Sequence, residues 1–99
     1  MKKIIDNKIY DTDNCDILVS YFTIVEHPGM FCSSYVKHEA KIYKTQKGTY
    51  LRYIGRAKDT GWEDKNELTI ISKDKFKEIL IDLNEIEVYE KEFGKLEEG

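Results

Sequence analysis

One stretch of the sequence, residues 41–56, most constrains what this chain can fold into. It reads Lys-Ile-Tyr-Lys-Thr-Gln-Lys-Gly-Thr-Tyr-Leu-Arg-Tyr-Ile-Gly-Arg, so two runs rich in aromatic and β-branched residues flank a short polar segment with Gly48. Such runs favour strands, and a glycine between them supplies the positive φ that a tight turn needs. The stretch therefore predicts a β-hairpin.

The residues that lead into this turn alternate between two kinds of side chain. Val36, His38, Ala40 and Ile42 fall on one side of the segment 35–45, and the other side is charged and aromatic. A period of two with one polar face indicates an antiparallel sheet that is packed on one side and wet on the other. We therefore expect a small antiparallel sheet centred on a hairpin over residues 35–56.

The C-terminal third predicts one more strand and then two helices. Residues 68–71 have strand composition, and Ser72 is a good N-cap for the helix that follows. The spacing i, i+3, i+4 and i+7 then marks one buried stripe, formed by Phe76, Ile79, Leu80 and Leu83. Asn84 and Glu87 match a capping box for a second helix, and Gly94 stands where that helix would end.

The N-terminal third predicts shorter elements. Residues 2–10 indicate a small hairpin that turns at Asp6 and Asn7, which both tolerate the left-handed region. A short helix is predicted over residues 13–20, although the apolar residues 17–19 are also compatible with a strand. Residues 21–25 favour a strand, Pro28 and Gly29 favour a type II turn, and residues 30–32 are expected to pair back across it.

Helices gathered after the strands favour an α+β fold over an α/β one. We expect a single domain over residues 1–99, with a short N-terminal hairpin and helix and with C-terminal helices packed on the sheet. No apolar run is long enough to span a membrane and no signal-peptide pattern follows Met1, so we expect a cytoplasmic protein. Two cysteines, Cys15 and Cys32, do not make a disulfide framework there, and we expect both to be reduced and mostly buried.

The charges are unevenly distributed, although the net charge is only −3. Residues 36–60 carry seven lysines and arginines against two acids, whereas residues 73–99 carry five lysines against nine acids. Basic residues interleaved with tyrosines on a sheet are typical of nucleic-acid binding, and acids on the outer arc of a helix suit a partner's basic channel. The alternative is that both are simply solvated faces. The candidate partner-binding residues are Lys41, Lys44, Lys47, Arg52, Arg56, Glu85, Glu90, Glu92 and Trp62, which is either a plug under its polar loop or an exposed anchor.

No combination of residues points to catalysis. A metal site would need Cys15, His27, Cys32 and His38, whose spacing matches no zinc motif, so core thiols and surface imidazoles are the simpler interpretation. A Cys–His nucleophile pair would lack an oxyanion motif, and the isolated glycines form no phosphate-binding loop. We therefore expect no catalytic residues, no metal, no cofactor and no enzymatic activity.

Three patches of the chain resemble a group of small accessory proteins from phages, plasmids and conjugative elements of Gram-positive bacteria. Residues 3–12, Lys-Ile-Ile-Asp-Asn-Lys-Ile-Tyr-Asp-Thr, look like the opening motif of these proteins, with Asn7 in place of the usual glycine. Residues 42–51 resemble their central hairpin, and residues 89–94, Tyr-Glu-Lys-Glu-Phe-Gly, resemble their closing motif. The resemblance covers most of the chain except about residues 21–36, which look like an insertion.

The resembling motifs consist of turns, caps and core aromatics, and no catalytic residues travel with them. Some proteins of this kind act as anti-CRISPR or other anti-defence factors. The resemblance therefore implies a non-enzymatic accessory protein that binds and inhibits a host defence complex, such as a CRISPR nuclease, in the cytoplasm of a bacterial host. The alternative is a small nucleic-acid-binding regulator that uses the basic hairpin face.

Overall fold

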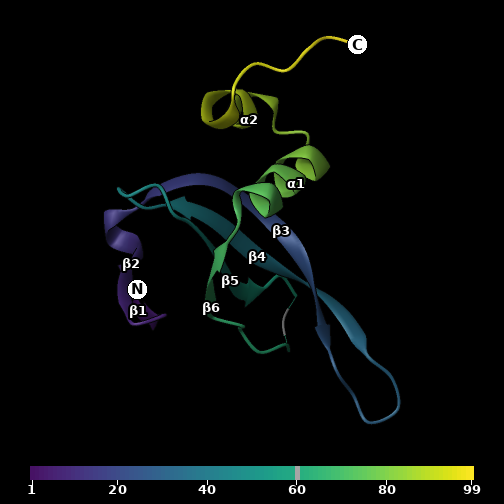
Figure 1. Ribbon diagram of the computed structural model, residues 1–99. Helices are drawn as coiled ribbons and strands as arrows, with labels where there is room; N and C mark the ends of the chain where they lie inside the picture. Colours follow the sequence, from purple (N-terminus) through teal and green to yellow (C-terminus); the bar gives the residue numbers. More distant parts are fainter. Residues whose placement is uncertain (60) are drawn as a thin grey trace.

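The structure is a computed structural model that describes residues 1–59 and 61–99. Its centre is a four-stranded antiparallel sheet in which each strand pairs with its neighbour in the chain (Figure 1). The strands are β3 (Asp16–His27), β4 (Ser34–Lys44), β5 (Tyr50–Ala57) and β6 (Glu67–Ile71). The predicted α+β fold is confirmed, with the β4–β5 hairpin in the middle of the sheet.

The β4–β5 hairpin turns where the sequence predicts. Gly48 has a φ of 89°, and its amide donates to the carbonyl oxygen of Thr45 over 3.0 Å. The Thr45 hydroxyl accepts a second hydrogen bond from the Thr49 amide, also over 3.0 Å. Further along, the register between the two strands shifts once, between His38 and Ala40. This bulge lies at the point where β4 begins to project beyond β5.

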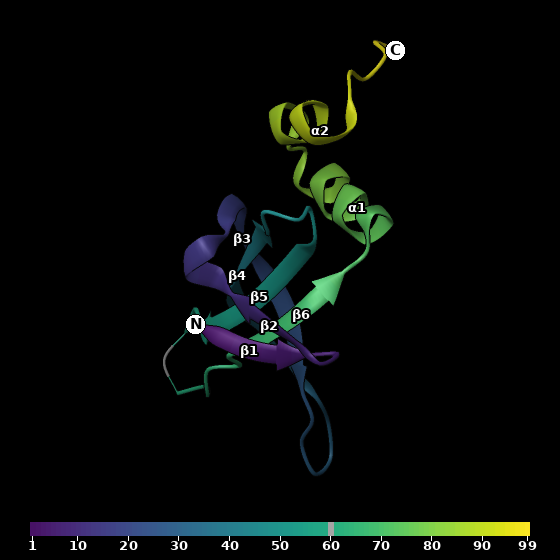
Figure 2. The same cartoon turned by 60° about the vertical axis from the view of Figure 1, so that its left-hand side comes forward.

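The N-terminal hairpin covers one face of the sheet. It consists of β1 (Lys2–Ile5) and β2 (Lys8–Asp11), and it turns at Asp6 and Asn7, which have φ values of 51° and 63° as predicted. Figure 2 shows the hairpin lying across β5 and β6. Ile5 and Tyr10 pack there against a core cluster formed by Tyr43, Leu51 and Leu68.

The prediction of a short helix over residues 13–20 is wrong. A single 3₁₀ turn, η1 (Thr12–Asn14), follows the hairpin, and β3 then begins at Asp16. The Asp11 carboxylate does cap this turn, because it accepts from the Asp13 amide over 3.1 Å. Val19 nevertheless pairs with Ile42 in the sheet, so strand pairing overrides the local helix signal.

The helix α1 (Lys73–Leu83) covers the opposite face and begins as predicted. The hydroxyl of Ser72 caps it by accepting from the Lys75 amide over 3.0 Å. The stripe that faces the sheet contains Phe76, Ile79 and Leu80, all of them buried. These three side chains pack with Val19 and Ile42 to form the largest core cluster.

The helix α2 (Ile86–Phe93) follows after a turn that differs from the prediction. Asn84 has a φ of 57° and closes α1, so it does not cap α2, and the predicted capping box is absent. Glu85 precedes α2 and makes no side-chain capping hydrogen bond. Phe93 extends the core with an edge-on contact to Phe76 at 5.7 Å between ring centroids. Among the described residues, no helix is long and apolar enough to cross a membrane.

Candidate functional site

The outer half of the β3–β4 hairpin projects beyond the rest of the sheet (Figure 1). β5 pairs with β4 only from His38 onward, whereas β3 and β4 remain paired out to His27 and Ser34. Residues 24–37 therefore form a two-stranded arm, called the ribbon below. The ribbon coincides with most of the segment that the sequence marks as an insertion.

The tip of the ribbon presents apolar side chains to solvent. Met30 and Phe31 are 91% and 95% exposed, and Tyr35 on the adjoining strand is 69% exposed. Residues 30–32 do not pair back across the turn as predicted, because His27 pairs with Ser34 and residues 28–33 form the connecting loop. Monomeric proteins rarely expose apolar groups together, so this tip has the character of an interaction surface.

The loop at the tip has a defined shape. A Cβ atom on Gly29 would collide with the carbonyl oxygen of Cys32, so glycine is needed where the loop folds onto itself. The Ser33 hydroxyl donates to the Glu26 carboxylate over 3.0 Å. Cys32 itself is exposed, which corrects the expectation that both cysteines are mostly buried. Met30 and Phe31 are thus exposed to solvent on a loop whose two ends are joined by a hydrogen bond.

Two histidines link the outer end of β3 to the part of β4 that pairs with β5. The Nε2 atoms of His27 and His38 lie 2.8 Å apart, and Nδ1 of His38 lies 2.9 Å from the carbonyl oxygen of Gly55. Because a carbonyl only accepts, Nδ1 of His38 carries the proton, and Nε2 of a neutral His38 accepts from Nε2–H of His27. His38 is fully buried, so the expectation of two surface imidazoles is wrong for this residue.

The arrangement of the two rings identifies this contact as a hydrogen bond. The ring planes differ by 15° and the centroids lie 5.1 Å apart, so the Nε2 atoms meet head-on between two nearly coplanar rings. A metal ion between them would need about 2.0–2.1 Å to each nitrogen, which this separation does not provide. Within the described chain, no group of three or more His, Cys, Asp or Glu residues is placed to hold a metal.

Trp62 packs against His27 of this pair. Its ring is tilted against His27 with a centroid distance of 5.0 Å, and 40% of the residue remains exposed. The loop that carries it is tied back by the Lys65 amide, which donates to the carbonyl oxygen of Gly55 over 2.9 Å. The structure thus places this predicted partner-binding residue against His27 at the outer end of β3, partly covered and partly accessible.

The basic residues predicted to bind a partner do not gather on one surface. Arg52 pairs opposite Ile42 whereas Lys41 pairs opposite Tyr53, so these two basic side chains leave the sheet on opposite faces. Arg52 and Lys41 are half-buried, and Arg56 is exposed near the register shift. The basic hairpin face expected from the sequence is therefore divided.

Lys44 and the predicted acidic residue Glu92 form a tertiary contact with each other. Lys44 Nζ lies 2.8 Å from the Glu92 carboxylate, and the Tyr50 hydroxyl donates to the same oxygen over 3.0 Å. Burial opposes ionisation of Glu92, but the hydrogen bonds from Lys44 and Tyr50 outweigh it and lower the pKa of this carboxyl. The Glu92 side chain is only 7% exposed, so it does not lie on the outer arc as expected.

The other two predicted acids also have local roles. The Glu90 carboxylate accepts from the Leu96 amide over 2.9 Å, which holds the C-terminal tail against α2. Glu85 occupies the turn between the helices and donates its amide to the carbonyl oxygen of Leu80 over 2.9 Å. The three acids therefore do not present one continuous acidic surface.

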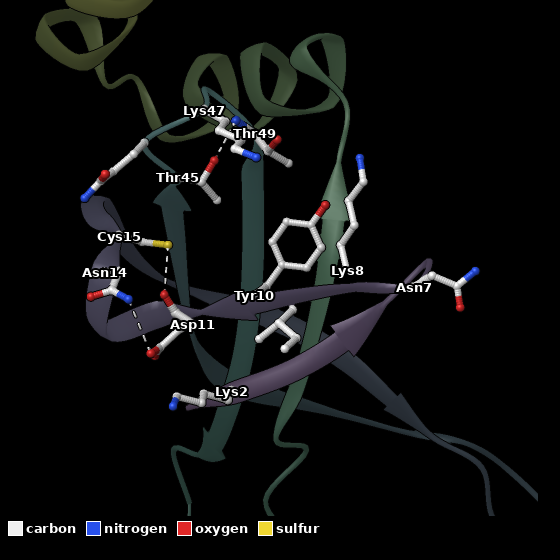
Figure 3. Close-up of a pocket in the computed structure, with 12 residues that line it drawn as sticks. Lys2, Asn7, Lys8, Tyr10, Asp11, Asn14, Cys15, Thr45, Lys47 and Thr49 are labelled. Carbon is white, nitrogen blue, oxygen red and sulfur yellow. Dashed lines mark hydrogen bonds between the residues drawn. The ribbon is translucent and has the colours of Figure 1, made fainter.

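A shallow open groove of about 1010 Å³ lies between the N-terminal hairpin and the β4–β5 turn (Figure 3). Three lysines, Lys2, Lys8 and Lys47, line it together with Tyr10. The one acid in its lining, Asp11, is engaged by the Asn14 amide and by the chain of η1. Lys47 thus lines one groove together with two lysines that lie far from it in the sequence.

Cys15 lines the same groove and is half-buried. Its thiol donates to the carbonyl oxygen of Asp11 over 3.3 Å. Burial, followed by the charges of Asp11 and Asp16, raises the pKa of Cys15, so the residue stays in the less reactive thiol form. This position suits a packing role.

Comparison of the chain with protein-family models, with curated proteins and with solved structures finds no match.

Proposed function

We propose that this chain is a non-enzymatic accessory protein of a mobile element that binds a host defence complex through the ribbon and inhibits it. The observation that carries this proposal is the pair of apolar residues Met30 and Phe31, 91% and 95% exposed at the end of a projecting arm. The sequence resemblance to accessory proteins, some of them anti-CRISPR factors, supplies the class of partner.

The ribbon has the properties that a binding anchor needs. A side chain that enters a partner's pocket contributes most when it is large, apolar and held in place before binding. Two-stranded hairpins alone are marginally stable, but here the Ser33–Glu26 hydrogen bond ties the two strands beside the loop, and the His27–His38 contact links the outer end of β3 to the point where β4 begins to pair with β5. The partner would offer an apolar cleft wide enough for Met30 and Phe31.

An interference assay tests the proposal. A bacterial strain with an active CRISPR system is transformed with a targeted plasmid, in the presence or absence of this protein. We expect the protein to raise transformation, and Met30→Asp with Phe31→Asp to abolish this effect. The matched control is Ile9→Asp, which places a charge on an exposed apolar residue of the N-terminal hairpin. Full activity of the tip variant, or loss of activity in the control, would refute the proposed surface.

The alternative function, a nucleic-acid-binding regulator, has one observation in its favour. Lys2, Lys8 and Lys47 surround a single groove beside Tyr10, which suits contact with phosphates and one stacked base (Figure 3). On this alternative, the chain binds single-stranded DNA, binding weakens as salt rises, and Lys2→Glu with Lys47→Glu removes it. Fluorescence anisotropy with a labelled oligonucleotide decides between the two functions, because the main proposal requires no such binding.

A further inference from the structure

The two edges of the central sheet differ in how they are protected. β6 has five residues, β1 lies beside it, and Nζ of Lys3 donates to the carbonyl oxygen of Leu68 over 2.9 Å. β3 at the other edge has twelve residues, and among the described elements only β4 packs extensively beside it. Natural proteins shield long edge strands because their free backbone groups pair with other strands.

The middle of β3 lacks the usual protections of an edge strand. Residues 16–27 include no lysine and no proline, and the seven residues from Val19 to Val25 carry no charge. The register shift in this strand lies between Ile17 and Val19, which leaves residues 19–27 as a regular edge. On the outer side, Phe22 and Ile24 are 51% and 62% exposed. One side of this segment therefore has no neighbouring strand in the sheet.

We propose that β3 pairs in antiparallel fashion with β3 of a second copy of this chain, about a two-fold axis at Thr23. Thr23 is the midpoint of the regular segment 19–27. The axis places Phe22 opposite Ile24 of the second copy, Tyr21 opposite Val25, and Thr23 opposite Thr23. Aromatic with β-branched pairs and threonine pairs are the cross-strand combinations that stabilise antiparallel sheets.

The distribution of charge permits a second copy to pair here and selects the axis at Thr23. This axis places Glu26 opposite Ser20 of the other copy and leaves Asp16 outside the paired segment, so no like charges meet. An axis at Tyr21 would instead place Asp16 opposite Glu26. The two ribbon tips point away from each other in the proposed dimer, so both remain free for the partner of the proposed function, on which the dimer does not depend.

Light scattering coupled to size-exclusion chromatography tests the dimer and its register. The wild-type chain is expected to elute with twice the 11.7 kDa mass of one chain. Phe22→Glu with Ile24→Glu places like charges opposite each other at two symmetric positions, and we expect a monomer. Phe22→Glu with Ile24→Lys changes the same positions but pairs opposite charges across the axis, and we expect the dimer to persist.

Thermal melts of both double variants establish that the fold survives, as expected for exposed side chains. A wild-type chain that stays monomeric at every concentration would overturn the proposal. A monomer whose β3 amides become protected from hydrogen exchange only when another protein binds would also overturn it, in favour of a foreign strand. Loss of the dimer in both double variants would contradict the axis at Thr23.

Discussion

Two buried polar groups hold separate parts of this chain together. Glu92 joins α2 to the end of β4 through Lys44 and Tyr50, and His38 joins β4 to His27 and to the carbonyl oxygen of Gly55. A buried polar group is expensive to leave unpaired, so changes at these positions should cost more than their contact area indicates. The two groups lie in separate regions, so each can be tested by its own substitution.

Glu92→Gln is expected to lower stability in a pH-dependent way. The folded-state pKa of Glu92 is lowered, so its ionised form contributes stability above the ordinary carboxyl pKa, and this contribution is lost as pH falls through the folded pKa. We expect the melting temperature near pH 7 to fall by about 5 °C and the difference from wild type to narrow below about pH 4. Glu97→Gln, on the exposed tail, is the control, and a constant difference at every pH would contradict this account.

His38→Ala is expected to destabilise the fold far more than His27→Ala. The first change removes a fully buried ring together with its hydrogen bond to the Gly55 carbonyl oxygen, which keeps only the Lys65 amide as a donor, and this should cost about 2–4 kcal/mol. His27 is only half-buried, and its removal should cost about 1 kcal/mol. Urea denaturation measures both values, and equal losses would show that the His38–Gly55 bond carries little weight.

At the scale of elements, the length of β3 decides the shape of the molecule. A short helix over residues 13–20 would have left a compact sheet, whereas the twelve-residue strand carries the hairpin well past β5. The apolar run at residues 17–19 fits both structures, because a short run has no clear period. Pairing with β4 selects the strand over the helix, and the local sequence does not reveal this pairing.

The junction between the helices depends on one residue in the left-handed region. Asn84 has a φ of 57° and its amide donates to the carbonyl oxygen of Ile81 over 3.1 Å. Asn84→Gly should leave stability nearly unchanged, because glycine adopts this conformation freely, while Asn84→Ala should cost about 1 kcal/mol. Thermal melts of the two variants compare them directly, and equal stability would mean that the junction does not retain this conformation.

At the scale of the whole molecule, the periodic segments were predictable and the contacts between them were not. The alternation in residues 35–45 and the stripe at Phe76, Ile79 and Leu80 gave the sheet and α1, because each follows from a repeat along the chain. Asn84 closes α1 and does not cap α2, a difference that the sequence does not reveal because the same residue type serves N-caps and left-handed C-caps.

The candidate site was harder to predict for the same reason. His27 and His38 are eleven residues apart on different strands, so nothing in their spacing indicates a direct hydrogen bond. Met30 and Phe31 follow a Pro-Gly pair and resemble the start of a strand, and only the register of β3 with β4 places them in an exposed loop. Residue type alone marks Trp62 as a candidate, and only the structure places it beside the ribbon.

The central claim, that the ribbon tip is the surface that contacts a partner, is tested most directly by photo-crosslinking in a host with an active defence complex. A photoreactive phenylalanine analogue is placed at Phe31, or at Ile81 on the exposed side of α1 as a control. We predict that the analogue at position 31 crosslinks to a subunit of the defence complex and that the analogue at position 81 does not. Crosslinking from position 81 with none from position 31 would contradict the account.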